Sequence, residues 1–172
     1  MSSLKAYVKG LIDIVVNNTP SSQIAVTFYS GRNSIETTAF YSASNAGVLK
    51  TLVDDFNDYS GKTALYGATE HSLKVLKELD FEGGLSLISL CDGKDNDSDK
   101  PDSALSRIDD YLVTRYSIGI KNEGFKKEHI RNVSSRSSTC YVGESVSQIQ
   151  EFTAELELQL TSKYNAHYTR SN

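Results

Sequence analysis

Segments that favour helices alternate with segments that favour strands along almost the whole chain of 172 residues. Apolar residues spaced by three and four predict helices over residues 4–16, 48–56, 63–79, 125–133 and 145–160, and a short helix is expected around 104–109. Short β-branched or apolar runs lie between them, at 24–29, 34–40, 85–90, 112–120 and 139–142. Strands that alternate with helices build βαβ units. The chain is therefore predicted to form a doubly wound, three-layer α/β fold, with a mostly parallel central sheet and helices on both faces.

Length and charge limit the classes of protein to which the chain can belong. We expect a single domain over residues 1–163, followed by a polar tail at 164–172. A net charge of -4 opposes binding to nucleic-acid phosphates, which requires clustered Lys and Arg. No apolar run reaches the roughly 20 residues that span a bilayer, and the first residues lack the pattern of a secretion signal. We expect a cytoplasmic protein without nucleic-acid or membrane partners.

An acidic stretch follows the strand at 85–90, with five aspartates between positions 92 and 102. The aspartates at 95, 97 and 99 have the spacing of the first ligands of an EF-hand calcium loop. Lys100, however, stands where that loop needs glycine, and no glutamate follows at its twelfth position. The stretch is therefore not an EF-hand, and we interpret Asp97, Asp99 and Asp102 as solvated loop and helix-start residues.

Motifs for common enzyme chemistries are absent from the sequence. The three histidines lie far apart without an H-E-x-x-H pattern, and neither a G-x-S-x-G elbow nor a complete phosphate-binding loop occurs. We therefore expect a protein without catalytic activity. One enzymatic alternative stays open, a magnesium-dependent phosphoryl transfer that uses Asp92 at the end of a strand. The turn at 29–32 supplies no second carboxylate for that reaction.

Two segments taken together resemble the von Willebrand factor A domain family. A threonine opens a helix in the segment Gly61-Lys-Thr-Ala-Leu-Tyr66, and an aspartate closes the next apolar strand in Leu90-Cys-Asp-Gly93. Residues 113–120, 122–133 and 141–145 are similar to later segments of the family in the same order. The resemblance implies a Rossmann-like fold that binds proteins through a metal-ion-dependent adhesion site. It assigns Thr63 and Asp92 as ligands of Mg²⁺ or Mn²⁺.

The chain departs from the family at its start. The family's Asp-x-Ser-x-Ser motif ends the first, central strand, whereas this chain begins at the helix that follows that strand. The resemblance therefore implies an incomplete metal site and a sheet without its central strand. A partner or a swapped copy could supply the strand, which would make the chain a structural subunit or a homo-oligomer; the sequence could also be a piece of a longer protein. The expected binding surface consists of Ser2, Ser3, Thr63, Tyr66, Asp92, Lys94 and Asp95.

Overall fold

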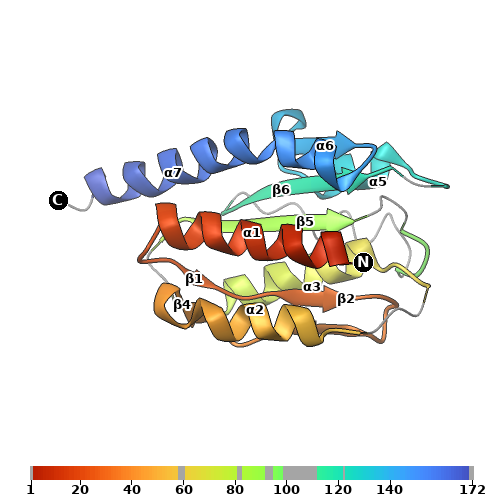
Figure 1. Cartoon of the computed structure of the whole chain (residues 1–172), viewed down its shortest axis with the longest axis horizontal. Helices are drawn as coiled ribbons and strands as arrows, with labels where there is room; N and C mark the ends of the chain where they lie inside the picture. Colours follow the sequence, from red (N-terminus) through yellow and green to blue (C-terminus); the bar gives the residue numbers. More distant parts are fainter. Residues whose placement is uncertain are drawn as a thin grey trace. The chain divides into compact units, whose positions relative to one another are not determined.

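The computed structural model describes residues 2–57, 61–80, 83–91, 95–98, 112–121 and 123–170, with the backbone alone at 2, 3 and 167–170 (Figure 1). These residues group into two compact units. The sheet unit comprises Thr27–Glu36 and Asp58–Ser145, and the helical unit comprises Met1–Val26, Thr37–Asn57 and Val146–Asn172. Within the described residues, no helix combines the length and the apolar character needed to cross a membrane.

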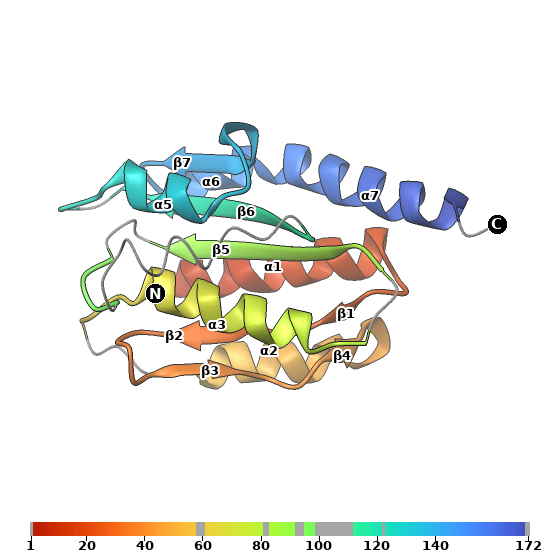
Figure 2. The same cartoon turned by 180° about the vertical axis from the view of Figure 1, so that it is seen from behind.

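A parallel three-stranded sheet forms the centre of the sheet unit. Its strands β5 (Leu85–Cys91), β6 (Val113–Ile120) and β7 (Cys140–Gly143) lie side by side in that order (Figure 2). Strand β6 is buried on both faces, which is typical of a parallel sheet covered from two sides. Two shorter strands, β2 (Thr27–Tyr29) and β3 (Ile35–Thr37), form a separate pair. The predicted parallel sheet is thus confirmed in the described strands.

The helices α3 (Leu65–Lys77) and α5 (Lys127–Val133) cover one face of this sheet. Alternate residues of each strand point to that face, and they meet the apolar side of the two helices. The buried cluster consists of Leu65, Tyr66, Leu73, Cys91, Val113, Ile130 and Val133, with Leu85, Leu87, Cys140 and Val142 packed against it. Glycine at position 119 lets α5 approach, because a Cβ there would lie 3.0 Å from side-chain carbons of both Ile130 and Phe125.

In the helical unit, α1 (Ser2–Asn18) packs against α2 (Ala46–Asp55), α6 (Val146–Glu151) and α7 (Thr153–Arg170). The core of the helical unit is apolar and includes Tyr7, Ile12, Leu49, Ile149 and Leu156. A short antiparallel pair, β1 (Gln23–Ile24) with β4 (Tyr41–Ser42), adjoins these helices. Two 3₁₀ turns, Ala43–Asn45 in this unit and Ser137–Thr139 in the sheet unit, complete the described elements.

Two predicted elements are divided in the structure. The prediction of one continuous strand at 24–29 was wrong, because the structure has two strands there, β1 and β2. Between them, Val26 exchanges hydrogen bonds with Thr38 and does not continue either strand pair. The expected closing helix is interrupted at Phe152, which separates α6 from α7. Helix α7 then continues to Arg170, through most of the predicted tail, while the helix expected near 104–109 lies outside the described residues. The single domain over 1–163 stays a prediction.

The close approach at Gly119 gives a first test. We expect Gly119→Val to destabilise the protein by about 1–3 kcal/mol, because the added carbons would overlap Ile130 and Phe125. Denaturant unfolding measures this change. Gly10→Ala in α1 is the control: nothing lies within 4 Å of its Cβ, and alanine should stabilise that helix by up to about 1 kcal/mol. Equal effects of the two substitutions would contradict the packing described for α5.

Candidate binding site at the N-terminal end of α3

The candidate site lies where β5 ends and α3 begins, at the same end of the sheet unit (Figure 1). Thr63 stands just before α3, and residues 95–98 follow β5 after a short interval. The Thr63 N–H donates to the Asn96 side-chain oxygen at 2.8 Å, and its carbonyl accepts from the N–H groups of Asn96 and Asp97 at 2.9 and 3.1 Å. The backbone of Thr63 is therefore fixed by this segment, which we call the clamp (residues 95–98).

Helix α3 receives its N-terminal caps from the clamp. Ala64 precedes the helix and has no side chain that could cap it. The Asp95 carboxylate accepts instead from the Tyr66 N–H at 2.8 Å, and the Ser98 hydroxyl accepts from the Gly67 N–H at 3.1 Å. A negative charge is also favourable at a helix N-terminus. These bonds fasten a loop that is distant in sequence to the first turn of α3.

Asp97 fastens the other side of the clamp to the turn after β2. Its carboxylate accepts from the backbone N–H of Arg32 at 2.8 Å and lies 3.4 Å from the Lys62 ammonium. Glycine is needed at position 31, because a Cβ there would lie 2.9 Å from the same carboxylate. The Asp97 side chain is only 12% exposed. The interpretation of Asp97 as a solvated loop residue was therefore wrong: it joins three segments of the sheet unit.

Tyr66 and His129 both contact the clamp residue Asp95. Tyr66 is 1% exposed, and its ring centroid lies 5.5 Å from that of His129. The His129 Nδ1 accepts from the Asp95 N–H at 2.9 Å, and the Asn132 side-chain amide donates to the Tyr66 hydroxyl at 3.4 Å. Burial raises the pKa of Tyr66, so this phenol stays neutral. Tyr66 therefore contributes to the site as packing and not as an exposed contact.

The structure brings together only some of the residues expected to bind. Thr63 and Asp95 both take part in the contacts between the clamp and the start of α3, whereas Asp92 and Lys94 lie outside the described residues. Ser2 and Ser3 belong to the first turn of α1 in the helical unit, so their part in the surface stays a prediction. The sequence analysis missed Asn96, Ser98 and His129. The predicted helix begins at Thr63, whereas α3 begins at Leu65 after an alanine that cannot cap it, so the need for caps from elsewhere became visible only in the structure.

The described residues supply little of a metal site by themselves. The Thr63 hydroxyl has no hydrogen-bond partner among them and is a hard oxygen donor of the kind that Mg²⁺ prefers. The Asp95 carboxylate already accepts three hydrogen bonds, from the Tyr66 N–H and from the N–H and hydroxyl of Ser98. Within the described part of the chain, no three His, Cys, Asp or Glu side chains gather as a metal site would require. Of the two predicted ligands, Thr63 lies within the described residues and Asp92 does not, so their role as ligands stays a prediction.

Removing the cap at Asp95 tests the clamp. We expect Asp95→Ala to lower the free energy of unfolding by about 0.5–2 kcal/mol, because the Tyr66 N–H loses its acceptor at the start of α3. Asp55→Ala, at the exposed end of α2, should change it by less than about 0.5 kcal/mol. Denaturant unfolding compares the two variants. The role of Asp95 as a cap is refuted if both variants unfold like the unmodified protein.

Asp97 makes stability depend on pH. The backbone N–H of Arg32 and the ammonium of Lys62 hold its pKa below the usual value. Such a carboxylate stabilises the fold above its unfolded pKa of about 3.9, and the contribution is lost as the pH falls through the lower, folded value. Stability should therefore fall less steeply in Asp97→Asn than in the unmodified protein on acidification below about pH 4. Unfolding measured from pH 7 to pH 3 checks this, and parallel curves would speak against the contact.

Comparisons with known proteins agree with this architecture. The family model described as von Willebrand factor type A domain matches residues 1–155. Proximal thread matrix protein 1 from the mussel byssus, solved with zinc in its metal-ion-dependent adhesion site (MIDAS), has a TM-score of 0.71 at 21% identity over 92% of this chain and 42% of that one. The pilus adhesin SpaC from Lactobacillus rhamnosus GG has a TM-score of 0.76 at 10% identity, over 95% and 28% of the two chains. A von Willebrand factor type A protein from Catenulispora acidiphila has a TM-score of 0.74 at 18% identity, over 94% and 38%.

The chain spans less than half the length of these three structures. A search of curated proteins gives no match. The structural likenesses confirm the predicted three-layer α/β fold, and the family match covers most of the sequence. The alternating pattern, the parallel sheet and the threonine before α3 therefore lead to one conclusion: this chain belongs to the von Willebrand factor type A domain family.

Proposed function

We propose that this chain is a protein-binding module without catalytic activity, and that its partner binds at Thr63 through a divalent cation. The family is one of protein-interaction and adhesion modules. The observation that carries the proposal concerns Thr63. Two clamp residues, Asn96 and Asp97, hold its backbone by hydrogen bonds, and its hydroxyl has no partner among the described residues. A fixed backbone with an unused donor or acceptor is suited to bind a ligand with little loss of entropy.

The cation would be held by Thr63 and Asp92, with further ligands from outside the described residues. Mg²⁺ and Mn²⁺ prefer such hard oxygen donors, and the zinc in the mussel protein's adhesion site adds Zn²⁺ as a third candidate. A cation bound this way keeps a position open for a carboxylate of the partner. Lys94 and Asp95 would border this position, with Asp95 acting through the clamp, while the part of Ser2 and Ser3 stays a prediction. Phosphoryl transfer by Asp92 stays the less favoured alternative, because the turn at 29–32 supplies no second carboxylate.

The hydroxyl of Thr63 is the point to test. We expect millimolar Mg²⁺, Mn²⁺ or Zn²⁺ to raise the unfolding temperature, since a ligand at a hundredfold excess over its Kd stabilises by about 2.7 kcal/mol. Thr63→Val should abolish this rise. With the cation present, a short peptide containing one aspartate should shift the amide NMR signals of residues 61–67 and 95–98, and the same peptide with asparagine should not.

The matched control is Thr51→Val, which removes an exposed hydroxyl that bonds only to the Gly47 carbonyl within α2. It should keep both the cation response and the peptide response. The proposal fails if no cation stabilises the unmodified protein, or if Thr63→Val responds like Thr51→Val.

A second candidate function, a subunit completed by a strand from another polypeptide or a swapped copy, is favoured by the position of β5. This strand has the apolar sequence of a central strand, yet it ends the described sheet and is only half-buried over residues 85–90. A strand at such an edge can accept another strand through backbone hydrogen bonds. A swapped copy would appear as a dimer in sedimentation; a partner's strand would leave the isolated chain monomeric.

A further inference from the structure

The turn after β2, residues 30–34, has a fixed position beside Thr63. Within this turn, the Ser30 N–H donates to the Ser34 carbonyl at 3.0 Å. The Ser30 carbonyl accepts from the N–H of Ala64, the residue that follows Thr63, at 2.7 Å. Strand β2, which leads into the turn, also contacts α3. A charge that the turn carries is therefore held close to the candidate cation ligand.

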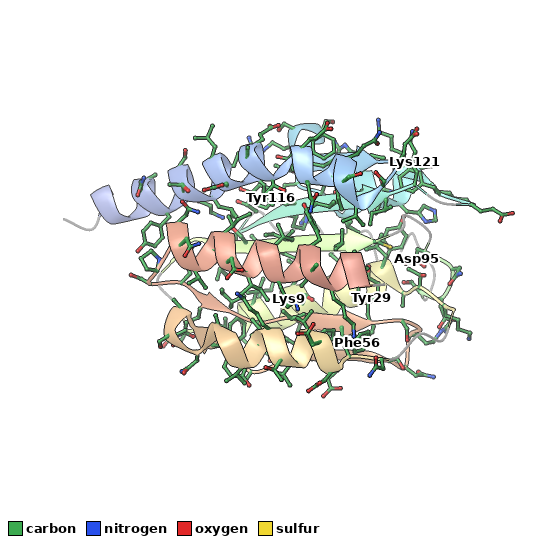
Figure 3. All side chains as sticks on the ribbon, in the orientation of Figure 1. Lys9, Tyr29, Phe56, Asp95, Tyr116 and Lys121 are labelled. Carbon is green, nitrogen blue, oxygen red and sulfur yellow. The ribbon has the colours of Figure 1, made fainter. Side chains whose placement is uncertain are left out.

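A side-chain hydrogen bond holds the end of β2 to the end of β5. The Tyr29 hydroxyl donates to the Leu90 carbonyl at 3.1 Å. Figure 3 shows Tyr29, the last residue of β2, and the clamp residue Asp95 toward the same end of the sheet unit. The turn that follows Tyr29 and the clamp that follows β5 are thus joined to the same part of the fold, and both stand on backbone that hydrogen bonds fix.

Two cations flank the Asp97 carboxylate where the turn meets the clamp. The Arg32 Nε lies 3.7 Å from Oδ1 of Asp97, and the Lys62 Nζ lies 3.4 Å from the same oxygen. Lys62 directly precedes Thr63 and lies across the turn, since a Cβ at Gly31 would be 3.4 Å from a carbon of its side chain. Two positive charges and one negative charge leave a net charge of +1. We call Arg32 and Lys62 the cationic rim.

The members of this charged group differ in their exposure to solvent. The side chains of Lys62 and Arg32 are 63% and 48% exposed, whereas that of Asp97 is 12% exposed. The anion is therefore covered and the two cations face the solvent. An ammonium or guanidinium group has several N–H donors, so it can pair with a second carboxylate while it keeps the first. The cationic rim thus presents positive charge to a ligand bound at Thr63.

We propose that the partner segment that binds at Thr63 is acidic beyond the one carboxylate that meets the cation: a second Asp or Glu of the partner pairs with Lys62 and Arg32. The inference rests on the proposed function and names the chemistry of its partner. Residues 62 and 63 are neighbours, and consecutive Cα atoms are about 3.8 Å apart in the chain and in an extended peptide alike. The second acidic residue therefore lies one or two positions from the first.

This selection is local, because the chain as a whole carries a net charge of -4 and does not attract acidic molecules. Exposed charges are largely screened beyond about 8 Å at physiological ionic strength. A carboxylate placed beside the cationic rim consequently interacts with Lys62 and Arg32 more strongly than with charges farther away. Exposed ion pairs are weak, so the second acidic residue should tighten binding by roughly two- to fivefold and not by orders of magnitude.

Two synthetic peptides test the cationic rim on the full chain. Both contain one central aspartate, which is flanked on each side by glutamate in the first peptide and by glutamine in the second. Isothermal titration in millimolar Mn²⁺ should give a Kd roughly two- to fivefold lower for the glutamate peptide. The difference should vanish at about 1 M salt, which screens exposed ion pairs. It should also vanish in the double variant Lys62→Gln with Arg32→Gln.

The matched control is the double variant Lys126→Gln with Lys127→Gln, which removes two exposed cations at the start of α5 in the same unit. It should keep the preference for glutamate. If the unmodified protein binds both peptides equally, or if the two double variants behave alike, the role of the cationic rim is overturned and the cation site at Thr63 stands. If neither peptide binds in Mn²⁺, the proposed function fails and this inference fails with it.

Discussion

The hydrogen bonds between the clamp and the first turn of α3 are the interactions on which the candidate site depends. A helix begins with N–H groups that need acceptors, and Ala64 cannot provide one. Asp95 and Ser98 supply them from a loop that follows a different element, and the same four-residue loop fixes Thr63 and the turn at Gly31. The requirement of one helix end therefore positions the residue that we propose as a cation ligand.

The acidic character of this loop has a structural cause. Two of its carboxylates lie at places where negative charge is favourable: Asp95 at a helix N-terminus, and Asp97 beside the Arg32 N–H and the Lys62 ammonium. Both carboxylates already accept hydrogen bonds from backbone N–H groups of the protein. Acidic clusters in a sequence are easily interpreted as metal loops, yet a carboxylate that already accepts hydrogen bonds from its own fold has less to offer a cation. The neutral hydroxyl of Thr63 is the better candidate for that reason.

The two proposed binding sites have one feature in common: each presents polar groups that have no hydrogen-bond partner among the described residues. At Thr63 a hydroxyl without a partner among the described residues stands on a fixed backbone, and β5 forms an edge of the sheet in the described part of the chain. Both sites follow from secondary-structure elements that are complete in themselves but leave polar groups for a further molecule. Strand addition and cation-mediated contact are different recognition modes, so one partner could use either site without the other.

The sequence by itself determined the order of elements, the parallel sheet and the family. Apolar spacing marks the buried faces of α3 and β5 because burial is the dominant favourable term in folding, and it acts on every residue of a periodic run. Pairs of contacts distant in sequence were decided only by the tertiary structure: Asp95 with α3, Asp97 with Gly31 and Arg32, and Tyr29 with Leu90. Such contacts depend on which polar groups the fold leaves without partners, and no local pattern records that. Asp97 was for this reason interpreted as solvated, although the fold uses it as a link.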